Sequence, residues 1–172
     1  CYWQNNSKSI ALSVWNVTPK DVMGYEKAVE WNGLIGAFGF IVTFSIAFYL
    51  AKLAKKHGAK MIHFACLLFG AISFLWFPTI QNQYVFFAVI IGYGIAWASM
   101  MGIPYLMVVA VIPKERYGVY MGIINMMIVI PMIIQNLSFG YILKNFLDND
   151  PRQAISFAGV LLMLAAICTL LI

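Results

Sequence analysis

The chain has 172 residues, of which 63% are hydrophobic and only 10% charged, and its formal net charge is +5. Its mean hydropathy is +0.86. A soluble domain carries about 25% charged residues, so this composition leaves too little polar surface to cover a water-exposed globule. It excludes a soluble globular domain and indicates an integral membrane protein, and we expect no nucleic-acid partner.

Hydrophobic blocks of about twenty residues or more follow one another along the chain. A block of this length crosses a hydrocarbon core roughly 30 Å thick, and backbone polar groups in lipid must be paired within a helix. The short alternating segments of a membrane β-barrel do not occur in the sequence. We therefore predict an all-α membrane protein with five transmembrane helices, at about residues 31–53, 61–80, 84–112, 117–143 and 154–172.

The segment before the first span is less regular. We expect residues 1–29 to form an extracytoplasmic loop, with the tip of a preceding helix at "CYWQ". Within it, residues 4–27 could fold as a lid over the outer mouth or remain without fixed structure. The chain starts at Cys1 without Met and stops at "AAICTLLI" without a polar tail, so we interpret it as a fragment of a longer transporter.

Charged residues set the topology. The turn between the first two spans carries lysines and no acid, and Lys114 and Arg116 stand beside Glu115 between the third and fourth. An excess of positive charge in short loops marks the cytoplasmic side. This places both turns on the cytoplasmic side of the membrane and residues 1–30 and 144–152 on the outer side. The positive net charge of the chain is therefore a signal of topology.

Small residues mark one face of the first span, where membrane helices can approach closely. We interpret this face as a packing surface in preference to a substrate contact, and the Gly118–Gly122 pair that opens the fourth span in the same way. The residues of the face in the first span are Asn32, Gly36, Gly39 and Thr43.

Aromatic residues distinguish the third span. In "IIGYGIAWASMMGIPY", glycine and proline loosen the helix, as in the interrupted segments near transporter binding sites. Tyr93 and Trp97 are four residues apart and therefore share one helical face. Their rings could stack on the apolar face of a sugar while the tyrosine hydroxyl hydrogen-bonds to it. The alternative is that both rings only pack against neighbouring helices.

Two amides distinguish the fourth span. Asn125 and Asn136 are eleven residues apart, close to three helical turns, and so lie on one face with Pro131 between them. Polar amides are costly in lipid and usually face a cavity or a partner helix. Substrate binding and interhelical hydrogen bonding are both compatible with this pattern.

The sequence gives little support to metal binding, cofactor binding or catalysis. Cys66 and Cys168 lie in apolar spans, and neither His57 nor His63 is arranged with a cysteine or carboxylate partner. There is no metal-ligand spacing and no glycine-rich phosphate loop. We therefore expect no metal, no cofactor and no enzymatic activity.

The stretch "AKLAKKHGAK" at residues 51–60 resembles the cytoplasmic loop motif of the major facilitator superfamily, G-x-L-A-D-R-x-G-R-R. Lys56, Gly58 and Lys60 are among the residues that match in kind, whereas Lys55 replaces the acid and Ala59 an arginine. A gating role at the cytoplasmic turn is what the resemblance implies for Lys56, Gly58 and Lys60.

A longer match covers "GIPYLMVVAVIPKERYGVYMGIINMMIVIPMII". It resembles the sucrose and maltose transporters of the same superfamily, which are related to the glycoside–pentoside–hexuronide cation symporters. The matching pieces include Gly102-Ile103-Pro104-Tyr105, the Pro-x-x-Arg-x-Gly formed with Arg116 and Gly118, and Asn125. The resemblance extends over residues 30–172, and it implies that Arg116 and Gly118 also belong to the gating residues of the cytoplasmic loops.

By this resemblance, residues 30–172 are a five-helix C-terminal half-domain with helices 8–12 of a twelve-helix transporter. Such transporters carry a disaccharide by alternating access, with proton symport, and the resemblance implies that the third span lines the cavity and the fourth flanks it. From the aromatic and amide patterns in these two spans, we predict Tyr93, Trp97, Asn125 and Asn136 as substrate-binding residues. The expected partners are a sugar, protons, the lipid bilayer and the N-terminal half of the same chain, in a bacterial inner (plasma) membrane.

The sequence offers no proton carrier within the spans, because every acid lies in a loop or at a span edge: Asp21, Glu26, Glu30, Glu115, Asp148 and Asp150. A membrane-embedded ionisable group would then belong to the N-terminal half. Two alternatives stay open. One is a carrier of a different solute, such as a drug, a peptide or an organic ion, and the other is a membrane scaffold without transport.

Overall fold

The computed structural model describes residues 2–17, 20 and 22–171 of the chain. Every regular element in these residues is a helix, and α2 to α6 are long and apolar enough to cross a membrane. The prediction of an all-α protein with five spans is therefore confirmed. The elements are α1 (Tyr2–Ile10), the π-helical turn η1 (Ala11–Trp15), α2 (Val22–His57), α3 (Ala59–Trp76), the 3₁₀ turn η2 (Phe77–Thr79), α4 (Val85–Val109), the 3₁₀ turn η3 (Lys114–Arg116), α5 (Tyr117–Phe146) and α6 (Pro151–Leu171).

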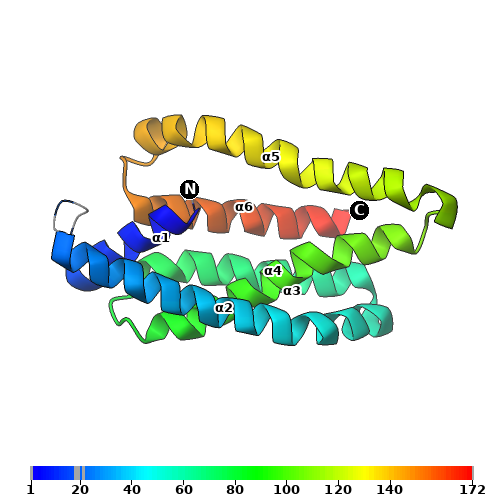
Figure 1. Ribbon diagram of the computed structural model, residues 1–172, viewed down its shortest axis with the longest axis horizontal. Helices are drawn as coiled ribbons and strands as arrows, with labels where there is room; N and C mark the ends of the chain where they lie inside the picture. Colours follow the sequence, from blue (N-terminus) through cyan, green and yellow to red (C-terminus); the bar gives the residue numbers. More distant parts are fainter. Residues whose placement is uncertain (1, 18–19, 21, 172) are drawn as a thin grey trace.

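The long helices run side by side, and their connections alternate between the two ends (Figure 1). The turns α2–α3 and α4–α5 share one end, while the connections η2–α4 and α5–α6 and the start of α2 lie at the other. The two basic turns predicted to share a side of the membrane thus lie at the same end. We call this end cytoplasmic and the opposite end outer, following the positive charge.

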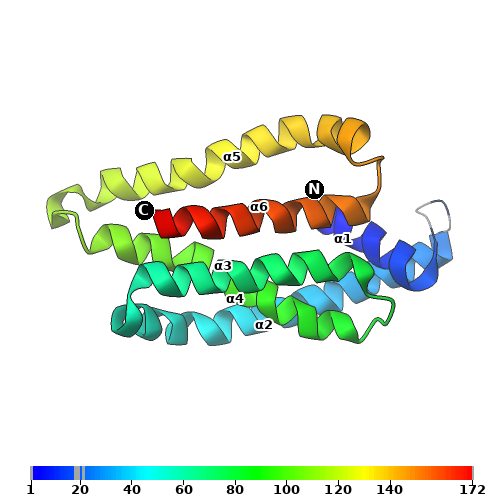
Figure 2. The same ribbon diagram turned by 180° about the vertical axis from the view of Figure 1, so that it is seen from behind.

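α3 lies at the centre of the bundle, packed against α4 and α6, and α4 also packs along α2. α1 lies between α2 and α6 in the outer half. α5 stands apart and meets the others mainly near the cytoplasmic end of α4 (Figure 2). Ile124 is the one buried residue among the described side chains of α5.

The main core lies in the outer half and is strongly aromatic. Phe77 and Phe86 pack with ring centroids 4.7 Å apart, and Trp31 of α2 meets Tyr84 edge-on at 5.4 Å. Residues of η1, α2, α3, α4 and α6 all contribute to this cluster. Edge-to-face and tilted aromatic pairs add to the burial of apolar area, so the outer ends of these helices are held in fixed positions.

The first residues are more ordered than the expected extracytoplasmic loop. Residues 2–15 are helical, and Asn6, Ser9 and Ile10 are almost completely buried between α2 and α6. α2 begins at Val22, so the boundary expected at residue 30 falls inside this helix. Aromatic and aliphatic side chains of η1 pack on the core, including Val14 and Trp15, and this apolar contact orders the segment.

A single residue joins α2 to α3. Gly58 has φ +90° and ψ 127°, a conformation that L side chains rarely adopt, and a Cβ at this position would have nothing within 4 Å. Glycine is the residue that reaches positive φ without steric cost. The tight cytoplasmic turn therefore depends on the backbone freedom of Gly58 and not on lack of space.

Gly58→Ala is expected to lower the free energy of unfolding by about 1–2 kcal/mol, since the added Cβ strains only the backbone. Gly118→Ala is the matched control, because Gly118 also has open space but lies in regular helix α5. The thermal unfolding midpoints of the two variants in detergent compare them directly. Equal midpoints would contradict the strained turn.

Asp150 directly precedes α6 and caps it. Its Oδ1 accepts a hydrogen bond from the backbone N–H of Arg152 at 2.8 Å, and its Oδ2 accepts one from the Arg152 guanidinium at 3.0 Å. Pro151, the first helical residue, has no N–H to leave unpaired. Partial burial raises the pKa of Asp150, but the hydrogen bonds and charge of Arg152 outweigh burial and hold the pKa below its usual value.

Asp150→Ala is expected to cost about 1 kcal/mol of stability at neutral pH, as for other N-caps. Because the folded-state pKa is lowered, the ionised cap stabilises the protein above the ordinary aspartate pKa and loses this effect as pH falls through the lowered value. The difference in thermal midpoint between wild type and variant should therefore shrink below about pH 4. Asp148→Asn is the control, because Asp148 is exposed and asparagine tolerates its positive φ of 48°. An unchanged difference at acid pH would contradict the ionised cap.

Candidate functional site

The candidate site is built on α4, which is held tightly between α2 and α3. Thr43 donates a hydrogen bond from its Oγ1 to the carbonyl of Gly94 at 3.1 Å. A Cβ on Gly94 would lie 3.0 Å from the carbonyl oxygen of Gly39, and one on Gly39 would lie 2.9 Å from Ile90. The predicted packing role of the small face in the first span is thus confirmed for Gly39 and Thr43.

The aromatic pair of α4 forms as predicted. The rings of Tyr93 and Trp97 are stacked, with centroids 5.9 Å apart and planes inclined by 27°. Both side chains are half-buried. Tyr93 also packs on Phe74 of α3 at 5.5 Å, so one side of the pair is held by the bundle and the other remains accessible.

A polar contact also joins α4 to α5. The Tyr105 hydroxyl donates a hydrogen bond to the Asn125 Oδ1 at 2.5 Å. This is the interhelical hydrogen bond that the sequence offered as one role for Asn125, and the side chain of Asn125 is still exposed. Asn136 is exposed on the same helix, about 16 Å further along at 1.5 Å per residue. α5 continues through Pro131 as one helix.

The residues of the predicted cytoplasmic loops gather at the end of the bundle where the turns α2–α3 and α4–α5 lie. Lys56 is exposed in the last turn of α2, Lys60 is half-buried in the first turn of α3, and Gly58 joins the helices. Arg116 is exposed where η3 meets α5. Gly118 and Gly122 have no described residue within 4 Å of an added Cβ, so the packing predicted for this pair is not seen in the described bundle.

A buried polar contact between α3 and α4 escaped prediction. The Nδ1 of His63 lies 2.7 Å from the Oγ of Ser99, which is completely buried. The buried Cys66 lies one turn beyond His63 on α3. The His63–Cys66 spacing of three residues predicts a shared face, but the serine that completes the contact lies on another helix.

The described acidic residues lie near the ends of the spans, as expected. Glu26 and Glu30 are exposed near the outer start of α2, and Glu115 is exposed in η3. The predicted Asp21 lies outside the described residues. Within the described part of the chain, no three side chains are grouped as metal ligands.

Comparison with known proteins identifies the family of this chain. The sequence model of the Major Facilitator Superfamily matches residues 9–136, which include α2, α3, α4, η3 and most of α5. None of the curated proteins or solved structures compared with the chain matches it. The family match spans about three quarters of the chain, and its members are membrane transporters. The chain therefore belongs to the Major Facilitator Superfamily.

Proposed function

We propose that the chain is the C-terminal half of a secondary active transporter that moves a disaccharide, such as sucrose or maltose, across a bacterial inner membrane. The observation that carries the proposal is the stacked, half-buried pair of Tyr93 and Trp97 on α4 of a superfamily member. Indole and phenol rings provide the flat apolar surface on which a sugar ring stacks, and the phenol adds a hydroxyl.

The rest of α4 and α5 suits a polar, uncharged substrate. Asn125 retains an exposed amide beside Tyr105, and Asn136 lies further along α5. An amide both donates and accepts hydrogen bonds, as a sugar hydroxyl requires. No lysine or arginine occurs in the sequence from Tyr84 to Ile112 to receive a carboxylate, which favours a sugar over an organic anion.

Transport would follow alternating access, in which two halves rock around a central site. α5 is largely free of the other described helices and joined to α4 near one end, an arrangement that lets the angle between them change. In the proposed symport, the proton-carrying acid belongs to the N-terminal half, since the acids of this chain lie near the span ends.

Uptake of labelled sucrose and maltose by cells that express the full-length transporter tests the proposal. Uptake that collapses on addition of a protonophore is the expected result. Uptake that is indifferent to the protonophore would retain sugar transport and remove proton coupling. No uptake of either sugar, with the protein shown to be in the membrane, would favour a carrier of another solute.

A further inference from the structure

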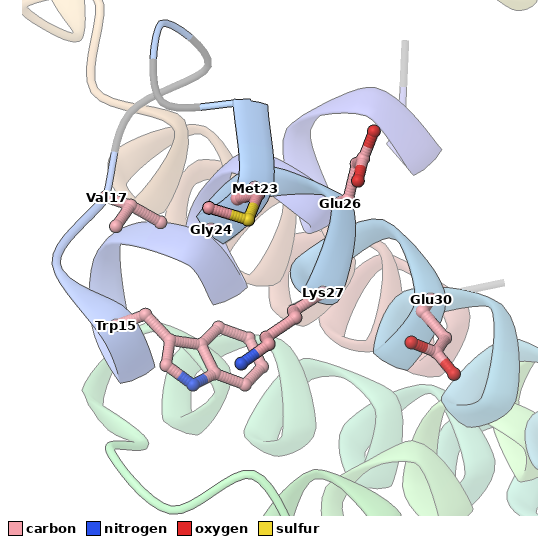
Figure 3. A pocket seen from close by; sticks show the side chains of 7 residues that line it. All are labelled: Trp15, Val17, Met23, Gly24, Glu26, Lys27 and Glu30. Atoms are coloured by element: carbon pink, nitrogen blue, oxygen red, sulfur yellow. The ribbon is translucent and has the colours of Figure 1, made fainter.

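A second pocket lies at the outer end of the bundle, far along the chain from the aromatic pair of α4. It has a volume of about 530 Å³ and forms where the chain leaves η1 and enters α2 (Figure 3). This lies within the usual size range of small-molecule pockets. We call it the outer pocket, and its lining residues are Trp15, Val17, Met23, Gly24, Glu26, Lys27 and Glu30.

One wall of the outer pocket is held in place by the core. Trp15 is half-buried and packs against the main hydrophobic cluster. Asn16 follows η1 as its C-cap and has a left-handed conformation. The N–H of Val17 donates a hydrogen bond to the carbonyl of Ala11 at 3.2 Å. The indole is therefore presented to the pocket by a rigid element, which lowers the entropy lost on binding.

The other wall is the start of α2, and it approaches the first wall closely. A Cβ on Gly24 would lie 2.8 Å from a methyl group of Val17. The absence of a side chain at Gly24 lets the two walls meet at the base of the pocket. Figure 3 shows Lys27 extending from α2 toward the Trp15 indole, with Glu30 one turn further along.

The charges of the outer pocket disfavour an anionic ligand. Glu26 and Glu30 are four residues apart on α2, where like charges repel each other. Neither makes an ion pair with Lys27 or another described residue. The only ion pair among the described residues joins Arg152 to Asp150, outside the pocket. The two carboxylates and the ammonium give the lining a net negative charge, which disfavours an anion, and together they accept and donate hydrogen bonds.

We infer that the outer pocket is a carbohydrate-binding site, separate from the aromatic pair of α4, that takes the transported disaccharide from the outer solution. The indole stacks on the apolar face of a sugar ring. Glu30 accepts a hydrogen bond from one of its hydroxyls, and Lys27 donates one. This inference rests on the proposed sugar transport and adds a second site to it.

The test is equilibrium binding of labelled maltose and sucrose to the purified full-length transporter in detergent. The expected result is two sites per molecule. Trp15→Ala should abolish the outer site or weaken it about tenfold and leave the other site unchanged, whereas Trp97→Ala should do the reverse. Because Trp15 also packs on the core, Glu26→Gln with Glu30→Gln provides a second variant that removes only exposed charge.

Glu115→Gln is the matched control, because Glu115 is an exposed glutamate at the cytoplasmic end. A single site that responds to Trp97→Ala and to neither outer-pocket variant would overturn the outer site and leave the proposed function standing. Two sites that both ignore the outer-pocket variants would also overturn it. Binding of neither sugar would overturn the outer site together with sugar transport.

Discussion

Trp97→Ala is expected to lower the uptake of labelled sugar by the full-length transporter by about tenfold at low sugar concentration. The substitution removes the Trp97 ring of the stacked pair, while Tyr93 stays packed on Phe74. Loss of an aromatic stacking partner costs about 0.5–1.5 kcal/mol beyond lost area, and about 1.4 kcal/mol corresponds to a tenfold change in affinity. Initial rates over a range of sugar concentrations, normalised to the amount of transporter in the membrane, provide the measurement.

Two variants make this result specific. Trp97→Phe keeps a flat ring and should retain a larger share of uptake than Trp97→Ala. Trp76→Ala removes an indole that is 52% exposed at the outer end of α3, away from the pair, and should transport like wild type. If Trp97→Ala transports normally, the ring serves packing alone and the proposed substrate contact is wrong.

Gly92→Ala is expected to destabilise the bundle by about 1–3 kcal/mol, the usual cost of overpacking a core. The added Cβ would collide with the Ser73 side chain and lie 2.9 Å from the Phe69 carbonyl oxygen. The serine could rotate, although its hydroxyl now donates to that same carbonyl at 2.9 Å. The carbonyl belongs to the backbone of α3 and cannot rotate, so the two helices must separate.

Gly102→Ala is the control within the same helix, because a Cβ at Gly102 meets nothing within 4 Å. It should be neutral or slightly stabilising, since alanine favours a helix more than glycine does. Thermal unfolding of the full-length protein in detergent compares the two variants, and the midpoint of Gly92→Ala should be the lower one. Equal midpoints would show that α3 and α4 are not packed through Gly92.

The positions of the helices could be predicted because each depends on local sequence. Hydrophobic length set the five spans, and lysine asymmetry grouped the turns at one end. α4 ends at Val109 instead of the predicted Ile112, since the chain already turns ahead of Pro113. Residues 2–4 are helical, as expected for a helix tip at "CYWQ", whereas residues 5–15 escaped prediction as helix because polar residues interrupt the apolar pattern there. Contacts with α2, α6 and the core hold α1 and η1.

The contacts of the candidate site were likewise predicted only in part from the sequence. The Tyr93–Trp97 stack follows from a spacing of four residues within one helix, so the sequence alone was sufficient to predict it. The contacts of His63 with Ser99 and of Tyr105 with Asn125 join residues 36 and 20 positions apart on different helices. No helical period connects such residues.

By itself, the sequence of this chain determined that it spans a membrane, how many times, and which turns share a side, because transfer of apolar and charged groups into lipid depends on local composition. The tertiary structure alone decided which faces of the helices meet, that α1 fills the outer half between α2 and α6, and that Trp15 lines a pocket with Glu26 and Glu30. These features depend on contacts between segments whose relative positions are set by side-chain packing across helices.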